Sequence, residues 1–289
     1  MRSRTKPARR VRIQLTMRFV LMAVLAAGLA AGAGPDARAI VSRAIEVEQS
    51  NYELLARYGF RERVKKIDFD KHGQPVKVDV KTFRVMIIEG GPYWRLVSRN
   101  GSPLSPAEEE SERIKLEQAI AARRRETEKQ RRERLRKSSK TRRQNREAIE
   151  EIPRAFLFEL TGEETVRSRP AWVIAFTPRP GYRPKHFRAR LFTKMSGRLW
   201  VDQETGHWVR VSAGLTGTVS FGWFLLRIYP LSKVEAEARL LDSGIWAIDR
   251  LWYIAALRAG LVKYMHWEQE HRYSDYRPPP AGPTERGKN

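Results

Sequence analysis

The segment at residues 186–210 constrains the fold of this chain more than any other stretch. It contains extended runs rich in Val, Trp, Leu and Phe between clusters of Gly, Ser and Asp, which is the pattern of tight β-hairpins. Because successive side chains of a strand point to opposite faces, the pattern predicts an inward aliphatic face made by Leu199, Val201, Val209 and Val211. Trp200 and Trp208 are predicted on the outward face between arginines. Large apolar side chains are therefore predicted on both faces of this hairpin.

Similar strand-like runs precede and follow this hairpin. They lie at residues 60–69, 76–88, 93–99, 155–160, 171–177, 218–229, 233–241, 244–248, 251–257 and 262–273. Short strands at this spacing, separated by turns, are typical of an open or closed antiparallel barrel. Residues 40–58 carry apolar side chains at the spacing of an amphipathic helix, which includes Val41, Ile45 and Tyr52. We expect this helix to pack on the sheet, either as plain core or as the lining of a ligand cavity.

The N-terminal residues have the composition of a secretory signal peptide. Residues 2–18 are strongly basic, residues 19–33 are almost wholly apolar, and Ala37-Arg38-Ala39 offers a small-x-small cleavage site. The apolar run of about 15 residues is shorter than the roughly 20 needed to span a bilayer, so cleavage is favoured over a permanent anchor. The chain could start at Met1 or at Met17. It contains no cysteine to receive a lipid anchor, so we expect a periplasmic protein that is not lipid-anchored.

A charged segment interrupts the strand pattern at residues 106–151. Ser105, Pro106 and Glu108 form the signature of a helix start, and we expect one helix from there to about residue 150. Residues 113–146 contain fifteen bases and four acids, and between residues 123 and 147 Leu135 is almost the only large apolar side chain. The segment is either a solvated spacer or a docking surface for anionic lipid or an acidic partner. The candidate contacts are Arg123, Arg124, Arg125, Arg131, Arg132, Arg142 and Arg143.

The formal net charge of +23 would suit a nucleic-acid partner, but two observations argue against one. Export removes the usual target, and no aromatic residues alternate with the basic ones as a base-stacking platform would require.

The sequence offers no positive sign of catalysis. It lacks the serine nucleophile elbow, the zinc-binding His-Glu-x-x-His, the phosphate loop and the dinucleotide fingerprint. His266 and His271 are five residues apart and make a poor metal pair, while His72 and His207 fall in predicted turns where we expect them to be solvated. Asp202 and other acids at strand ends are explained by turn formation. We therefore expect a protein that is not an enzyme and that has no cofactor or metal.

Several short motifs resemble the LolA/LolB-like superfamily of outer-membrane lipoprotein carriers and sorting proteins. They are the amphipathic helix after the signal, the segment Gly197-Arg198-Leu199-Trp200-Val201-Asp202, and the later Asp242-Ser243-Gly244-Ile245-Trp246. The chain also resembles exported proteins of this broad group through a second pattern, in which Pro92-Tyr93-Trp94-Arg95-Leu96-Val97 leads into a charged helical insertion and then into Ile152-Pro153-Arg154-Ala155-Phe156.

The resemblance implies an α+β fold, an incomplete (half) antiparallel β-barrel that covers helices and encloses a cavity for lipoprotein acyl chains. The half-barrel domain would span residues 40–277, with residues 106–151 as a long charged helical insertion and residues 278–289 as a disordered tail. Two features depart from the carrier pattern: the basic insertion, and the lack of a residue that aligns with the carrier's functional arginine. The missing anchor cysteine favours the soluble carrier form over the anchored receptor form.

These observations lead to two hypotheses from different classes. The first is a periplasmic protein that binds lipid acyl chains or a lipoprotein. Its cavity would be lined by Val41, Ile45, Tyr52, Leu199, Val201, Val209, Val211, Phe224 and Trp246. The second is an envelope interaction protein that docks on an anionic membrane surface through the basic helix. The sequence leaves the oligomeric state open.

Overall fold

The computed structural model describes residues 35–222, 225–260 and 262–279, without the side chains of residues 137–138 and 141–142. The chain divides into two compact units, Met1–Asp36 and Ala37–Asn289, and the fold below is that of the second. Nearly all of the predicted signal peptide, the cavity candidate Phe224 and most of the predicted tail lie outside the described residues. Within the described part, no helix combines the length and the apolar character needed to cross a bilayer.

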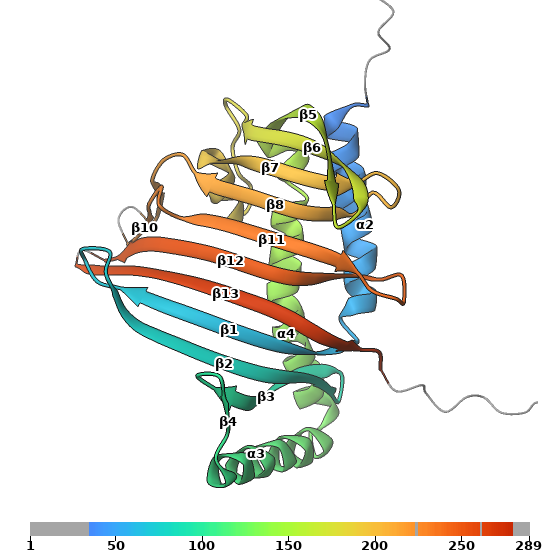
Figure 1. The fold of residues 1–289 in the computed structure, drawn as a ribbon, viewed down its shortest axis with the longest axis vertical. Coiled ribbons are helices and arrows are strands. Elements are labelled where there is room, and N and C mark those ends of the chain that lie inside the picture. Colours follow the sequence, from blue (N-terminus) through green and yellow to red (C-terminus); the bar gives the residue numbers. More distant parts are fainter. Residues whose placement is uncertain (1–34, 223–224, 261, 280–289) are drawn as a thin grey trace, which may run out of the picture. The chain divides into compact units, whose positions relative to one another are not determined.

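A large antiparallel sheet forms the body of this unit (Figure 1). Its strands are β1 (Gly59–Phe69), β2 (Pro75–Ile88), β3 (Gly91–Arg99), β4 (Ser102–Pro103), β5 (Phe156–Val166), β6 (Arg169–Pro178), β7 (Met195–Asp202), β8 (Trp208–Leu215), β9 (Val219–Phe221), β10 (Leu226–Ile228), β11 (Lys233–Leu240), β12 (Trp246–Ala259) and β13 (Lys263–Arg277). The helices are α2 (Ala37–Leu55), α3 (Pro106–Arg124), α4 (Glu128–Ile149), α5 (Ile152–Ala155) and the 3-10 helix η1 (Arg188–Lys194).

The strand order is β4-β3-β2-β1-β13-β12-β11-β8-β7-β6-β5, and the short β9–β10 hairpin pairs with β12. Two meanders are therefore joined where the first strand of one, β1, pairs with the last strand of the other, β13. The two edge strands, β4 and β5, do not pair with each other, so the sheet stays open. The predicted α+β fold with an open antiparallel sheet is confirmed.

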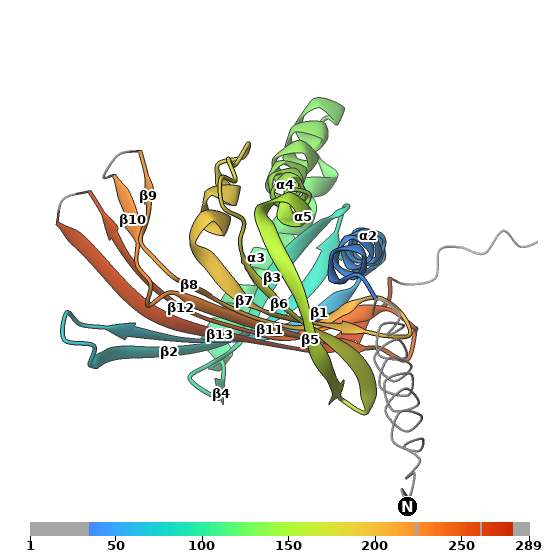
Figure 2. The ribbon, with the colours of Figure 1, turned by 90° about the horizontal axis from the view of Figure 1, so that it is seen from above.

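Helices α2, α4 and α5 lie on one side of the sheet, which we call the helix face (Figure 2). The amphipathic pattern of α2 explains its position, because Val41 and Ala44 pack against Ile174 of β6 and Val201 of β7. These four side chains are almost completely buried. Burial of an aliphatic side chain of this size contributes about 1.5–3 kcal/mol, so the contact fixes α2 on this half of the sheet.

The predicted hairpin is present as β7 and β8, but its faces differ from strict alternation. Between Trp200 and Val201 the register shifts, since Trp200 pairs with Arg210 and Val201 pairs with Trp208. The extra residue, Val209, is a β-bulge and packs with Trp200 away from the helix face. Trp208 instead points to α2, where its Nε1 donates to Glu48 at 2.8 Å. The predicted inward position of Val209 and outward position of Trp208 are wrong, because the bulge reverses the alternation.

The turn after β7 is tied to the neighbouring strand by the buried carboxylate of Asp202. Arg169 of β6 donates to both carboxylate oxygens, at 2.6 and 2.9 Å. The backbone N–H and the hydroxyl of Thr205 also donate to Asp202, each at 2.8 Å. Burial alone would raise the pKa of Asp202, but these hydrogen bonds outweigh it, so the pKa lies below its ordinary value.

The prediction of one helix from residue 106 to about 150 is wrong, because the chain turns between α3 and α4. The capping box predicted at Ser105 and Glu108 begins α3 and is confirmed. A second capping box, formed by Thr127 and Gln130, begins α4. This motif satisfies the free N–H groups of a new helix start and so favours a break in the helix. That the segment is an insertion relative to related proteins stays a prediction.

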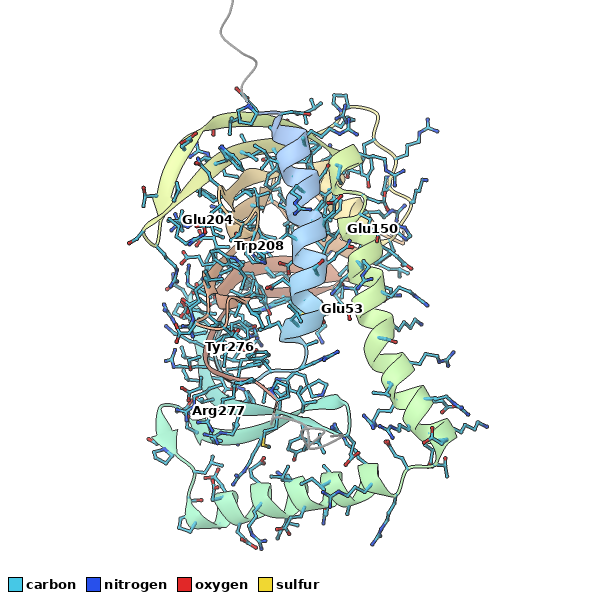
Figure 3. All side chains as sticks on the ribbon, turned by 90° about the vertical axis from the view of Figure 1, so that its right-hand side faces the viewer. Glu53, Glu150, Glu204, Trp208, Tyr276 and Arg277 are labelled. Atoms are coloured by element: carbon cyan, nitrogen blue, oxygen red, sulfur yellow. The ribbon has the colours of Figure 1, made fainter. Side chains whose placement is uncertain are left out.

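Helix α4 is attached to the sheet unit near both of its ends. Near its start, Arg134 donates to the carbonyl of Glu89 in the β2–β3 turn at 3.0 Å. Near its end, Arg146 donates to Glu53 of α2 at 3.0 Å, and Figure 3 shows the two helices side by side. The polar helix is therefore held by individual charged contacts rather than by an apolar stripe.

Glu151 fixes the connection between α4 and α5. Its side chain is only 2% exposed and accepts hydrogen bonds from the Tyr182 hydroxyl at 2.5 Å and from the backbone N–H groups of Lys185 and His186 at 3.0 and 2.9 Å. Burial alone would raise the pKa of Glu151, but these bonds outweigh it and hold the pKa below its ordinary value. The loop before η1 is thereby fastened to the end of α4.

Two predicted strand boundaries also change. The strand expected to begin at residue 186 starts only at Met195, because Arg188–Lys194 form η1. The runs expected at 244–248 and 251–257 are one strand, β12, opposite a register shift between Glu237 and Ala238 of β11.

Candidate functional site

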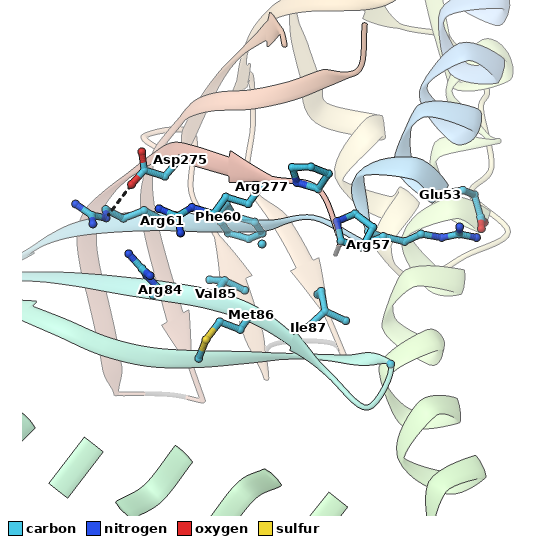
Figure 4. A pocket seen from close by; sticks show the side chains of 15 residues that line it. Glu53, Arg57, Phe60, Arg61, Arg84, Val85, Met86, Ile87, Asp275 and Arg277 are labelled. Carbon is cyan, nitrogen blue, oxygen red and sulfur yellow. Dashed lines mark ion pairs between the residues drawn. The ribbon is translucent and has the colours of Figure 1, made fainter. Parts of the chain in front are cut away.

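A cavity lies where the C-terminal end of α2 meets the sheet (Figure 4). It has a volume of about 650 Å³ and lies between the end of α2, the beginning of β1 and the ends of β2 and β13. Its apolar lining includes Phe60, Val85, Met86 and Ile87. Volumes of 300–1,000 Å³ are typical of small-molecule sites, so the hollow is large enough for a ligand.

A second, smaller cavity of about 230 Å³ continues from the first beneath α2. The two cavities share Ala56, Phe60 and Ile87 as lining residues. The remaining lining is mostly aromatic and aliphatic and consists of Tyr52, Leu55, Tyr58, Pro92, Ile248, Tyr273 and Tyr276. The two hollows are therefore adjacent, and together we call them the α2 cavity, with the smaller, apolar one as its inner part and the larger one as its outer part.

The rings of Phe60, Tyr273 and Tyr276 form the floor of the inner part. The Phe60 ring centroid lies 5.8 Å from that of Tyr273 and 5.6 Å from that of Tyr276. Residues three apart on a regular strand point to opposite faces, but the register shift of β1 against β13 and the positive φ of Asp275 (52°) place both tyrosines beside Phe60. Burial raises the pKa of both phenols, so they remain neutral.

The outer part of the α2 cavity is rich in arginine. Arg57, Arg84 and Arg277 line it, and none of them forms an ion pair with another described residue. Arg61 lies 3.5 Å from Asp275, as the dashed line in Figure 4 indicates. Guanidinium groups bind carboxylates and phosphates through two parallel hydrogen bonds, so this outer part suits an anionic group.

The structure brings one of the predicted cavity residues to the α2 cavity, namely Tyr52. Val41, Ile45, Leu199, Val201 and Val211 pack in the filled core between α2, α5 and the sheet. Val209 and Trp246 line a different hollow of about 330 Å³, together with Arg169 and Arg239. Phe224 lies outside the described residues.

The arginines, Phe60 and the two tyrosines of the α2 cavity were not predicted as site residues. No local motif marks them, because they come from β1, β2 and β13, which are far apart in the chain. The nearest signal in the sequence is the recurrence of arginine beside aromatic residues at the ends of these strands.

The predicted basic contacts fall into two groups. Arg123 is partly buried and donates to the carbonyls of Ile88, Gly91 and Pro92 in the β2–β3 turn at 2.8–3.0 Å. Arg124 and Arg143 lie 3.6 Å from Glu89 and Glu147, respectively.

The second group is exposed. Arg125, Arg131 and Arg132 have no ion pair with any described residue. The side chain of Arg142 lies outside the described residues. Arg123 is thus a structural residue, while the exposed arginines are available to a partner.

A polar network occupies the helix face beyond the α2 cavity, next to a hollow of about 380 Å³. Glu62 accepts a hydrogen bond from Trp94 Nε1 at 2.9 Å and lies 2.8 Å from His271 Nδ1. Burial alone would raise the pKa of Glu62, but the bonds from His271 and Trp94 outweigh it and lower the pKa. The Nε2 atom of His271 lies 2.9 Å from Gln269. Both ring nitrogens of His271 are thus within hydrogen-bond distance of a neighbouring side chain, and neither is left to contact a substrate.

The histidines differ partly from expectation. His72 is exposed in the turn at residues 70–74, as predicted. His207 is buried, which contradicts the predicted solvated position, because Glu48 of α2 lies 2.7 Å from its Nε2 and Trp246 stacks on its ring. In the described residues, no group of three or more His, Asp or Glu side chains is placed to hold a metal ion.

No family model matches the sequence, and neither does any curated protein. Solved structures that are similar include a putative outer membrane lipoprotein-sorting protein domain from Vibrio parahaemolyticus, with 9% identity, a TM-score of 0.34 and coverage of 82% of this chain and 92% of that chain. A DUF1329 family protein from Desulfovibrio piger has 11% identity, a TM-score of 0.32 and coverage of 85% and 94%. A LolA superfamily protein from Nitrosomonas europaea has 11% identity, a TM-score of 0.30 and coverage of 84% and 93%.

At these identities and TM-scores, the likeness carries neither a family nor a function over to this chain. What the chain binds has to be inferred from its own residues.

Proposed function

We propose that the protein binds the acyl chains of an amphipathic lipid or lipoprotein in the α2 cavity, without covalent chemistry. The observation that carries this proposal is that an apolar hollow and an arginine-rich one lie side by side and share Phe60 and Ile87 as lining residues. The acyl chain would lie in the inner part and an anionic headgroup at Arg57, Arg84 and Arg277.

The physical chemistry of the lining supports this ligand class. Each methylene group transferred from water to an apolar site contributes about 0.8 kcal/mol, and acyl chains need few directional contacts. The inner lining offers aromatic and aliphatic area with neutral phenols at its edge. The unpaired guanidinium groups of the outer part then favour an anionic over a neutral headgroup.

We place this activity in the periplasm because of the signal-peptide pattern of residues 1–39. Helix α2 begins at Ala37, inside the proposed cleavage site. Sequencing the N-terminus of the native protein would locate the cleavage.

The replacement of Ile87 by glutamate tests the cavity. Ile87 is 38% exposed, so a carboxylate at this position would be hydrated in the free protein and would lose that hydration only under a bound acyl chain, which should lower the affinity for a fluorescent fatty acid by about tenfold or more. The matched control is Val78→Glu on the same strand, since Val78 is exposed and does not line the cavity. The measurement is a fluorescence titration, joined by mass spectrometry of lipids extracted from the native protein. Native protein that is always free of lipid and takes up no labelled acyl chain would refute the proposal.

The exposed cations of α4 make docking on an anionic partner the second candidate function. Arg131, Arg132, Arg136 and Lys140 have no ion pair within the described chain. Replacing Arg131 and Arg132 by glutamate should weaken binding to a soluble acidic polymer such as heparin, and the difference should shrink at high salt because mobile ions screen exposed charges. Elution from a heparin column measures the effect. An unchanged elution would contradict a role for this helix.

A further inference from the structure

The end of the sheet opposite the α2 cavity exposes apolar side chains on two neighbouring strand ends. Val262 is 90% exposed, Leu225 is 65% exposed and Tyr264 is 44% exposed. The backbone N–H of Gly260 donates to the carbonyl of Leu225 at 2.7 Å, so Leu225 lies beside the end of β12, two residues before Val262 in the chain. Single exposed apolar residues are ordinary on a protein surface, but a group of them at one extremity indicates a contact site.

The two chain segments that carry these side chains are basic and contain no acid. Residues 205–234 and 251–267 include no Asp or Glu. Arg227 of β10 and Arg258 of β12 lie directly opposite each other, and Lys263 follows on β13. Like charges in opposite positions of a strand pair destabilise it unless an anion compensates them. Neither arginine has an ion pair among the described residues, and the Nε of each is buried without a hydrogen-bond partner.

The acids on the adjacent strand do not compensate these charges. Asp68 of β1 is 2.6 Å from Lys66, and Asp70 accepts hydrogen bonds from the backbone of its own turn. The six residues Leu225, Arg227, Arg258, Val262, Lys263 and Tyr264 therefore form an apolar tip with a cationic flank, which we call the hairpin end.

We propose that the protein docks on an anionic lipid membrane through the hairpin end. The apolar side chains of Leu225 and Val262 would enter the boundary between headgroups and acyl chains, and Arg227 and Arg258 would bind lipid phosphates. Surfaces that combine an apolar tip with flanking Lys and Arg bind in this interfacial zone, and the strength grows with apolar area and with anionic lipid content.

A second copy of the chain fits the hairpin end less well than a membrane. A symmetric dimer would bring each surface patch against its own copy, so the arginines of one protomer would face those of the other. The chain as a whole is also strongly cationic, with a formal net charge of +23. Charge complementarity therefore favours an anionic lipid surface.

The hairpin end and the α2 cavity are separate sites. They lie at opposite ends of β13, which begins at Lys263 and ends at Arg277 (Figure 2). At about 3.3 Å per residue the strand separates them by roughly 45 Å. Membrane docking can thus fail or succeed independently of acyl-chain binding, and Ile87→Glu should leave it unchanged.

The test is co-sedimentation of the full chain with vesicles of phosphatidylcholine, with and without phosphatidylglycerol. Wild-type protein should bind the anionic vesicles more tightly, and both Leu225→Ser/Val262→Ser and Arg227→Gln/Arg258→Gln should lower that affinity by about tenfold. The matched controls are Leu54→Ser/Ile114→Ser, which are exposed on α2 and α3, and Arg131→Gln/Arg132→Gln on α4, and both should stay within about twofold of wild type.

A site-specific probe gives a second measurement that does not depend on a loss of binding. The chain has no cysteine, so Val262→Cys carries a polarity-sensitive fluorophore at one position only. Its emission should shift to the blue on addition of anionic vesicles, while the same label at Ile114→Cys on α3 should not respond. The proposal is overturned if the emission of the label at position 262 does not change on addition of anionic vesicles. It is also overturned if the Arg131→Gln/Arg132→Gln control loses as much vesicle affinity as the hairpin-end variants. A third contrary result would be that the hairpin-end variants dissociate an oligomer in the absence of lipid.

Discussion

Replacing Asp202 by alanine is expected to lower the free energy of unfolding by about 3–5 kcal/mol. The carboxylate is fully buried and pairs with both donor positions of Arg169. Its removal leaves the partly buried guanidinium with only the exposed Glu204 as an ionic partner and frees the N–H and hydroxyl of Thr205. Breaking one side of a buried ion pair costs more than the pair contributes, because the remaining charge stays desolvated.

Urea unfolding of the full chain, followed by tryptophan fluorescence, measures this difference. The control is Asp242→Ala, since Asp242 is exposed at a turn and its loss should change the free energy of unfolding by less than about 0.5 kcal/mol. Equal effects of the two substitutions would show that the buried pair with Arg169 does not stabilise the fold.

Replacing Glu151 by alanine is the second change with a large expected effect, about 2–4 kcal/mol of the free energy of unfolding. The side chain accepts three hydrogen bonds, from Tyr182, Lys185 and His186, and is almost fully buried. Hydrogen bonds to a charged acceptor contribute about 1.5–3 kcal/mol each, and buried donors left without an acceptor add a further cost. Glu151→Gln should be milder, because its carbonyl oxygen can still accept.

The contribution of Glu151 should also depend on pH. Its pKa in the folded chain lies below the ordinary 4.5, so on acidification the unfolded state takes up its proton first. The stabilisation is therefore present above that ordinary value and is lost as pH falls through the folded-state pKa.

Urea titrations at about pH 7 and about pH 3 check this sign, since the gap between wild type and Glu151→Gln should shrink at the lower pH. A gap that is constant or that grows on acidification would contradict the ionised, hydrogen-bonded carboxylate. Glu150→Gln is the matched control, because Glu150 is the exposed neighbour.

The sequence reveals most of the local structure of this chain. Alternating apolar runs locate the strands, and the capping box at Ser105 and Glu108 locates the start of α3 within a residue. The break before α4 also has a sequence signal, because Thr127 and Gln130 repeat the capping-box motif. The uniformly charged composition of the segment instead suggested one uninterrupted helix. Local hydrogen-bonding patterns are encoded by residues a few positions apart and can be read without knowledge of the fold.

The errors come from contacts between distant residues. Val209 changes face because of a bulge that depends on the pairing of β7 with β8. His207 is buried because Glu48 reaches it from α2. The floor of the α2 cavity likewise requires the pairing of β1 with β13, which joins the two ends of the domain. A single sequence carries no direct signal for such pairings, so most residues of the α2 cavity could not be predicted from local patterns.

The attachment of α4 near both ends has a mechanical consequence for the open sheet. A closed barrel fixes its own radius through a complete ring of hydrogen bonds, which an open sheet lacks. Helix α4 contacts the β2–β3 turn through Arg134 on one side and α2 through Arg146 on the other. With 22 residues it measures roughly 33 Å at 1.5 Å per residue. Helix α4 therefore holds its two attachment points at a fixed distance. The curvature of the open sheet is limited by this rigid helix and not by closure of a barrel.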